Sequence, residues 1–267
     1  MRASPILSAA AIALALGLGA PLAVPAHAAT TGSMAIAAKG AAGTTVAGSN
    51  QFSVTGDTAV AMSVAHLSGG NAVLTAGPGG ALPTAVKFPA YVASGTYPRA
   101  VVKVAPTSGV ALSPGTADFQ YGAVFRLDAA SQGRTVDNGN NAFQRGLSSD
   151  PHMFKLEVDG GHPACTVRGT SGKVVVRSNV SVTPGAWYSA TCSRVAGTLS
   201  VTVAPYATSI ASSTTRTSSA SGSTGDVTFT SGITASIGGK LYDSGAIDSS
   251  ASDQFNGAIA EVWIKRT

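Results

Sequence analysis

The chain has few charged residues, few aromatic side chains and only two cysteines. Asp, Glu, Lys and Arg make up 11% of its 267 residues, and Phe, Trp and Tyr make up 6%. The basic residues stand singly along the sequence, so the formal net charge of +5 does not indicate a nucleic-acid-binding surface. We expect a mildly basic, solvated surface and no nucleic-acid partner.

Long apolar runs are absent except at the N-terminus. There, Ile6–Val24 is apolar, follows the positive Arg2 and precedes the small residues of Ala26-His27-Ala28. This order is typical of a secretory signal peptide with its cleavage site, here predicted over residues 1–28. We therefore expect a secreted, extracellular protein. No later run is long enough to span a bilayer, so we expect no membrane insertion.

The two cysteines are Cys165 and Cys192. An even number of cysteines in an exported protein favours a disulfide, and these two allow one intramolecular pairing. A metal site would need more ligands than two cysteines provide. We therefore predict a Cys165–Cys192 disulfide.

Strand signals run through most of the chain. In DFQYGAVFRLD, Asp118–Asp128, apolar side chains alternate with polar ones, which predicts a strand with one buried face. FKLEV and TLSVTV alternate in the same way, and no stretch shows helical periodicity. The sequence therefore predicts an all-β protein, a sandwich or a closed barrel. The side chains predicted to face inward in these three strands are Phe119, Tyr121, Ala123, Phe125, Leu127, Phe154, Leu156, Val158, Leu199, Val201 and Val203.

The composition also predicts how the mature chain is organised. Residues 29–50 are small and polar with several glycines, and we expect a flexible leader with at most weak strands. Residues 51–267 are expected to form one sandwich domain. Within it, Ala207–Gly225 is rich in Ser and Thr and of low complexity, which predicts a mobile loop.

The central and C-terminal parts of the chain carry a characteristic series of segments, which include YPRAVVKV (Tyr97–Val104), DFQYGAVFRLD, NAFQRG (Asn141–Gly146), FKLEVDGGHPACTVRG, GAWYSATCSR (Gly185–Arg194) and DQFNGAIAEVWI (Asp253–Ile264). In their order and spacing these segments resemble the laminin-G-like, or concanavalin A-like, lectin and glucanase domains of secreted bacterial proteins. Residues 51–80 are rich in Ala, Val and Gly and depart from the family pattern. The resemblance implies a two-sheet antiparallel jelly-roll sandwich that binds glycans or proteins, sometimes through Ca²⁺.

One short motif suggests catalysis. Glu157 and Asp159, in E-V-D, project from one face of a predicted strand, and sandwich-fold glycosidases place their active site on E-x-D-x-x-E. A retaining glycosidase needs two carboxyls about 5 Å apart. The position of the second glutamate is occupied by His162, and Glu261 is the only other glutamate of the chain. The motif therefore favours a polar strand ending in a turn over a catalytic site.

A run of oxygen-bearing side chains suggests a cation site. Asp137, Asn138, Asn140 and Asn141 could contribute carboxylate and amide oxygens to Ca²⁺. The alternative is a turn in which Asn and Gly adopt positive φ angles.

Aromatic side chains suggest a contact surface. Trp263 alternates with Glu261 and Lys265, so it is a candidate exposed ligand-binding residue. The alternative is a Trp covered by the Ser/Thr-rich segment or the leader. Tyr91 and Tyr97 are further candidates, whereas Trp187 is expected in the core.

These observations predict a non-catalytic module that binds carbohydrate or an extracellular surface protein. A polysaccharide-degrading glycoside hydrolase of the same superfold is the first alternative, with Glu157 and Asp159 as its catalytic residues. A structural extracellular protein without a specific ligand is the second. The fold alone does not decide among them.

Overall fold

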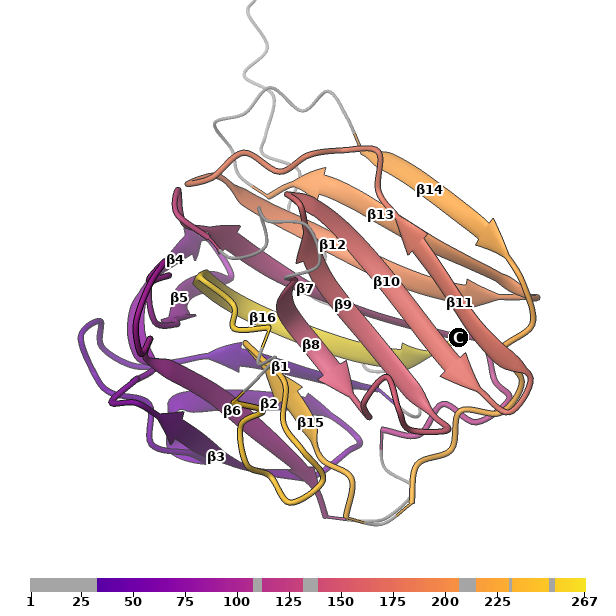
Figure 1. Ribbon diagram of the computed structural model, residues 1–267, viewed down its shortest axis with the longest axis horizontal. Helices are drawn as coiled ribbons and strands as arrows, with labels where there is room; N and C mark the ends of the chain where they lie inside the picture. The colour runs from indigo at the N-terminus through magenta and orange to yellow at the C-terminus, as the bar shows by residue number, and fades with distance from the viewer. Residues whose placement is uncertain (1–32, 108–111, 132–138, 207–214, 231, 250–252) are drawn as a thin grey trace, which may run out of the picture.

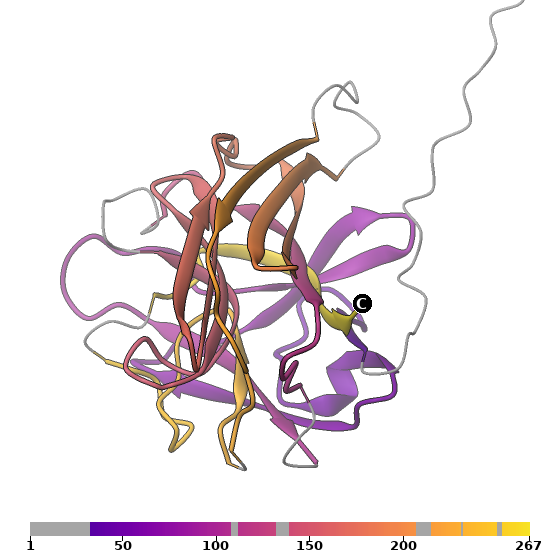
Figure 2. The same ribbon diagram turned by 90° about the vertical axis from the view of Figure 1, so that its right-hand side faces the viewer.

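The computed structural model describes residues 33–267 apart from 108–111, 132–138, 207–214, 231 and 250–252. These residues form two antiparallel sheets, together with a short 3-10 helix η1 (Ser49–Gln51). The predicted two-sheet jelly-roll sandwich is thereby confirmed (Figures 1 and 2). The predicted signal peptide, residues 1–28, lies outside the described residues. No helix among the described residues has the length and apolar character needed to cross a membrane.

The nine-stranded sheet places the first and the last of the described strands, β1 and β16, next to each other. In spatial order it contains β14 (Arg216–Ser221), β13 (Thr198–Pro205), β12 (Trp187–Val195), β7 (Phe119–Leu127), β16 (Gly257–Arg266), β1 (Met34–Ala38) and β2 (Phe52–Gly56), with β5 (Leu82–Lys87) paired to β16 and β4 (Val73–Gly79) paired to β5.

The seven-stranded sheet packs against it. In spatial order it contains β11 (Gly172–Arg177), β10 (His162–Gly169), β9 (Met153–Asp159), β8 (Asn140–Arg145), β15 (Ala235–Ile237), β6 (Arg99–Pro106) and β3 (Val60–Leu67).

The apolar faces of the two sheets meet in one main core. The inward-facing side chains predicted for β7, β9 and β13 are all buried there. At the centre, the rings of Tyr121 and Phe154 lie 5.1 Å apart, one from each sheet. The Tyr121 hydroxyl is buried but satisfied, because it donates to the Thr166 carbonyl oxygen at 2.9 Å.

The predicted disulfide joins the two sheets. Cys165 lies on β10 and Cys192 on β12, and their Cα atoms are 5.7 Å apart. The described residues contain no free cysteine. The disulfide prediction is confirmed, and the bond is a covalent tie across the core.

The prediction of a flexible leader over residues 29–50 is wrong for β1. Met34 and Ile36 are 1% and 2% exposed, and β1 pairs with β16 on one side and β2 on the other. Small alanines give this strand little contrast between its faces, so its sequence does not signal that it is buried.

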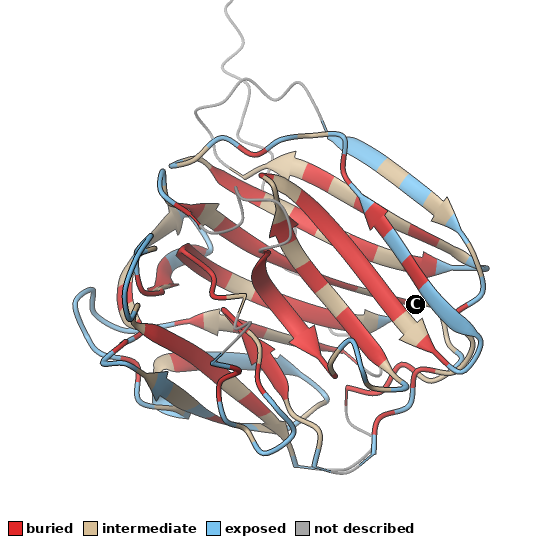
Figure 3. Ribbon diagram, viewed as in Figure 1, coloured by how far each residue is buried: buried red, intermediate tan, exposed pale blue. Residues whose placement is uncertain are grey.

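The prediction of a mobile loop over 207–225 is wrong for β14. Residues 216–221 pair in register with β13, from Arg216 opposite Val203 to Ser221 opposite Thr198. Figure 3 shows β14 as a largely exposed edge strand. Its run of Ser and Thr therefore forms a solvated strand rather than a loop.

Candidate functional site

The E-V-D sequence lies at the C-terminal end of β9, an interior strand of the seven-stranded sheet. Leu156 and Val158 point into the core and are 0% exposed, so Glu157 lies on the outer face. Figure 3 shows this alternation as bands along β9. Lys155 Nζ lies 2.6 Å from Glu157 Oε2, and the two side chains are 18% and 15% exposed. The ion pair is therefore largely withdrawn from solvent.

Two amide side chains of β8 lie on the same face beside this ion pair. Asn141 is opposite Glu157 in the strand register, and Gln144 is opposite Lys155. Asn141 Nδ2 donates to Gln144 Oε1, and Gln144 Nε2 donates to the Gly146 carbonyl oxygen at 2.6 Å. Asn141 Oδ1 is buried and accepts no hydrogen bond from the described residues. This chain of amides therefore ends on an acceptor that lacks a donor.

The backbone approaches Glu157 closely. A Cβ atom at Gly139 would lie 2.2 Å from Glu157 Oε2, so a side chain has no room there. The Asn141 N–H donates to the Asp253 carbonyl oxygen at 2.9 Å, while the Asp253 carboxylate lies 3.1 Å from Lys240 Nζ. We call this group of residues the Glu157 cluster: Glu157, Lys155, Asn141, Gln144 and Asp253.

Burial raises the pKa of the Glu157 carboxyl above its ordinary value. The Lys155 ammonium opposes this rise through its charge and its hydrogen bond, while the Asp253 and Asp159 carboxylates add to it. Glu157 therefore takes up a proton more readily than an exposed glutamate.

The carboxylates expected of a glycoside hydrolase are spread over both sheets. Asp159 follows Glu157 at the end of β9, and its Oδ2 lies 3.9 Å from Arg177 Nη1. His162, at the position of the second glutamate, has its Nδ1 3.0 Å from the Ser178 carbonyl oxygen. Glu261 lies on β16, in the other sheet. Glu157 therefore has aspartates, not Glu261, as its carboxylate neighbours.

The predicted exposure of Trp263 is wrong. Its side chain is 2% exposed and belongs to a second apolar cluster, on the outer face of the nine-stranded sheet. β5 contributes Leu82 and Ala85 to this cluster, and the β4–β5 hairpin stands out from the rest of the molecule in Figure 2. Trp187 is buried as predicted, but in this cluster rather than in the main core. The buried members of the cluster are Leu82, Ala85, Val124, Trp187, Ala258, Ala260 and Trp263.

The two candidate tyrosines, Tyr91 and Tyr97, lie in the segment between β5 and β6 and are not members of the Trp263 cluster. Both are half-buried. The Tyr97 ring covers the guanidinium of Arg99, whose Cζ lies 4.1 Å from the ring centroid. Arg99 was not a candidate from the sequence, because nothing in its neighbours along the chain marks it.

The predicted Ca²⁺ ligands do not come together among the described residues. Asp137 and Asn138 lie outside them. Asn140 is fully buried, and its side chain serves the fold: Nδ2 donates to Ser131 Oγ at 2.7 Å and Oδ1 accepts from the Asn256 N–H at 2.7 Å. No group of three or more His, Cys, Asp or Glu residues suited to a metal occurs in the described part of the chain. The described residues therefore do not fit a Ca²⁺ site.

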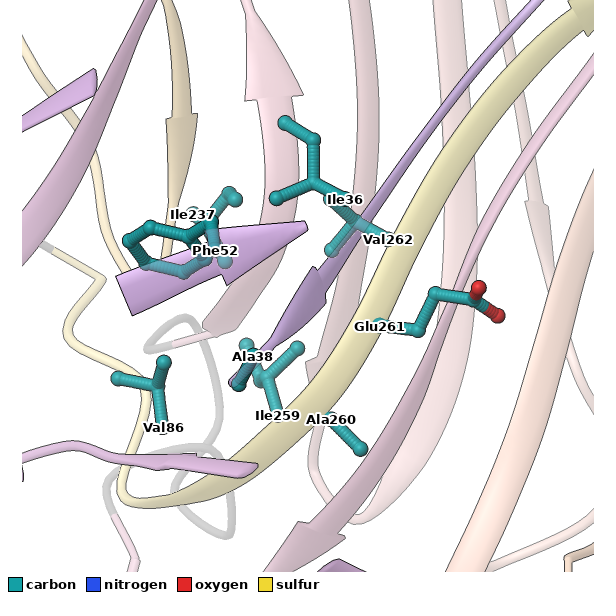
Figure 4. A pocket seen from close by; sticks show the side chains of 9 residues that line it. All are labelled: Ile36, Ala38, Phe52, Val86, Ile237, Ile259, Ala260, Glu261 and Val262. Atoms are coloured by element: carbon teal, nitrogen blue, oxygen red, sulfur yellow. The ribbon is translucent and has the colours of Figure 1, made fainter. Parts of the chain in front are cut away.

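A small pocket lies between the sheets and is apolar. Figure 4 shows that the side chains gathered around it are aliphatic or aromatic, whereas the Glu261 carboxylate points away from them. Burial raises the pKa of Glu261. The pocket offers no polar group to orient a ligand, so it belongs to the packing of the core. Its lining residues are Ile36, Ala38, Phe52, Val86, Ile237, Ile259, Ala260, Glu261 and Val262.

Comparison with known proteins shows similarity in fold only. No family model and no curated protein matches the chain. Domain 4 of AbnA, a GH43 extracellular arabinanase from Geobacillus stearothermophilus solved with arabinotriose, is 13% identical, with 77% of this chain and 82% of that chain covered and a TM-score of 0.49. The LG1-3 region of the laminin alpha2 chain is 10% identical, with 85% and 60% covered and a TM-score of 0.42. The enzymatically active domain of bacteriophage CBA120 tailspike protein 2 is 11% identical, with 76% and 28% covered and a TM-score of 0.49. At these values the likeness says nothing about the ligand of this chain.

Proposed function

We propose that the protein is an extracellular, non-catalytic module that binds carbohydrate through the Glu157 cluster. The observation that supports this most directly is Asn141 Oδ1, a buried acceptor without a donor, opposite the Glu157 carboxylate in the sheet. A buried acceptor is costly when unpaired, and a sugar hydroxyl that reached the 0% exposed Asn141 would supply the missing donor. The same hydroxyl can accept from Lys155 or Gln144 in turn.

The charges of the cluster favour a neutral ligand. Glu157 is paired with Lys155, and Asp253 is paired with Lys240. Opposite charges therefore balance locally, and what remains for a ligand is a set of planar donors and acceptors. These donors and acceptors suit the hydroxyl groups of a sugar better than the charged surface of a protein partner.

The cross-sheet disulfide supports an extracellular location. Disulfides persist in oxidising compartments and are rare where thiols are kept reduced. The Cys165–Cys192 bond thus agrees with the export that the sequence of residues 1–28 predicts.

A binding screen with matched glutamate variants tests the proposal. The purified protein would be screened on a glycan array, and hits would be measured by titration calorimetry. Glu157→Gln should weaken binding by about tenfold or more, because a charged hydrogen-bond partner is lost. Glu261→Gln, the matched control on the other sheet, should bind like the wild type.

The same hits would be assayed for released reducing sugar. Sugar released by the wild type but not by Glu157→Gln would overturn the non-catalytic assignment and support a glycoside hydrolase. No glycan binding at all would overturn the carbohydrate assignment and favour an extracellular protein partner or a structural role.

A further inference from the structure

Arg99 is a buried cation without an acidic partner. The residue is 7% exposed, and its Nε is buried without a hydrogen bond. No ion pair involves its guanidinium among the described residues. Its one polar contact there is with the face of the Tyr97 ring, at 4.1 Å. A buried guanidinium without a carboxylate or hydrogen-bond acceptor is unfavourable unless a bound ligand supplies one.

Arg194, a second arginine that is buried and stacked on an aromatic ring, shows how such a charge is compensated. Arg194 is 6% exposed and lies 4.6 Å over the Phe119 ring. Its Nη1 donates to the Gly225 carbonyl oxygen at 2.9 Å, and its Nη2 donates to the Gly115 carbonyl oxygen at 3.1 Å. Within the described part of the chain, Arg99 has the ring but not the acceptors, so its planar set of N–H donors has no hydrogen-bond partner there.

The surroundings of Arg99 fix its position on the outer face of the seven-stranded sheet. It lies opposite Leu67 at the start of β6, on the same face as Val101, which packs against Leu241 and Ile247. A Cβ atom at Gly70 would lie 2.3 Å from the Arg99 backbone, so the chain is tightly packed behind it. The Arg99 backbone is thus closely packed, and the Tyr97 ring covers the guanidinium.

We propose that Arg99 and Tyr97 form a binding site for the acid group, a carboxylate or a sulfate, of an acidic saccharide. A guanidinium presents two parallel N–H groups that match the oxygens of such an anion, and its charge cannot be lost by deprotonation near neutral pH. The site lies on the same sheet face as the Glu157 cluster. The saccharide assignment rests on the proposed function, whereas the anion site itself does not.

Replacement of Arg99 separates this role from a structural one. In thermal unfolding, glucuronate should raise the melting temperature of the wild type more than glucose does, since a ligand stabilises the state that binds it. Arg99→Met, which keeps an apolar stem without the charge, should abolish this shift and weaken glucuronate binding by about tenfold or more. Without ligand, Arg99→Met should be as stable as the wild type or more stable, because an uncompensated charge is removed.

Three results would overturn the proposal. An undiminished glucuronate shift in Arg99→Met would place the anion elsewhere. A clear loss of stability in ligand-free Arg99→Met would show that Arg99 has a structural partner. Acetate and inorganic sulfate acting as strongly as glucuronate would show that the site reads the anion alone and not a saccharide.

Failure of the proposed function can be told apart from these results. Glu157→Gln should retain the glucuronate shift while losing affinity for neutral oligosaccharides. If neutral oligosaccharides do not bind at all but the shift depends on Arg99, the Glu157 assignment fails and the Arg99 site stands.

Discussion

Single side chains in this sandwich bury charge in different ways. Glu157 is placed against Lys155, and Arg194 is surrounded by carbonyl oxygens. Among the residues that the structure describes, Arg99 contacts an aromatic face and no carboxylate. Because an unpaired buried charge costs far more than a paired one, these residues should respond differently to neutralisation.

Neutralising Glu157 should change how stability depends on pH. The folded pKa of Glu157 is raised, so its favourable contribution is complete below the unfolded pKa and is lost as pH rises through the folded pKa. The free energy of unfolding of Glu157→Gln, relative to wild type, should therefore increase as pH rises above the ordinary range of glutamate. Urea denaturation at several pH values between about pH 4 and pH 8 measures this difference. A difference that stays constant with pH would contradict the expected direction.

Adding a side chain at Gly122 should force Trp263 and its neighbours in the second apolar cluster to move. A Cβ atom there would lie 2.2 Å from Trp263 Cζ2 and 2.5 Å from the Ala190 carbonyl oxygen. Gly122→Ala should lower the free energy of unfolding by about 1–3 kcal/mol, as overpacking does elsewhere. Urea denaturation measures this loss, and Trp263→Phe should make it smaller by relieving one of the two contacts. An unchanged stability would show that the indole can move aside freely.

At the scale of elements, the sequence predicts strands whose two faces differ. β7, β9 and β13 alternate large apolar with polar side chains, and their inward faces are where the alternation puts them. β1 and β14 consist mainly of Ala, Ser and Thr, so no contrast marks them. What makes them strands is pairing with neighbours, and for β1 that neighbour is distant in the chain.

The candidate site could be predicted only in part, for the same reason: alternation along a strand is local, whereas pairing between strands is not. The outward direction of Glu157 could be predicted, because period-two alternation is local. Its neighbours could not, because they depend on the register of β8 against β9, including a shift between Asn141 and Phe143. Such a shift changes which residues oppose Glu157 and Lys155, and sequence alone does not specify it.

Truncating a β1 side chain tests whether that strand belongs to the folded domain. Ile36 is 2% exposed in the main core, so Ile36→Ala should lower the free energy of unfolding by about 2–5 kcal/mol. Val54→Ala on the neighbouring β2, where the side chain is 37% exposed, should change it by about 0.5 kcal/mol or less. Urea denaturation compares the two. Equal, small effects would indicate that β1 is not part of the cooperative unit.

At the scale of the whole molecule, the disulfide joins the two layers. Cys165 and Cys192 are separated by 27 residues and lie on strands of different sheets. The two layers are held together by packing, by the chain that runs between them and, among the described residues, by this disulfide. Its loss should therefore affect the stability of the sandwich as a unit.

Removing the disulfide should weaken the fold without changing its architecture. The double variant Cys165→Ala/Cys192→Ala should lose about 3 kcal/mol of unfolding free energy, because the unfolded chain gains freedom. Urea denaturation with and without reductant measures this loss. Reductant should destabilise the wild type and leave the double variant unaffected. Equal stability of both proteins without reductant would contradict this expectation.

The pairing of β1 with β16 has a consequence for how the chain matures. Met34 lies opposite Ile264, so the nine-stranded sheet joins strands from the two extremes of the described sequence. On the ribosome, β1 emerges long before its partner has been synthesised. The sheet cannot close until the last strand is free, and the large loop that must close makes this step slow. Until β16 has emerged, the apolar strand β1 (MAIAA) lacks this partner and presents an unpaired edge that is open to aggregation.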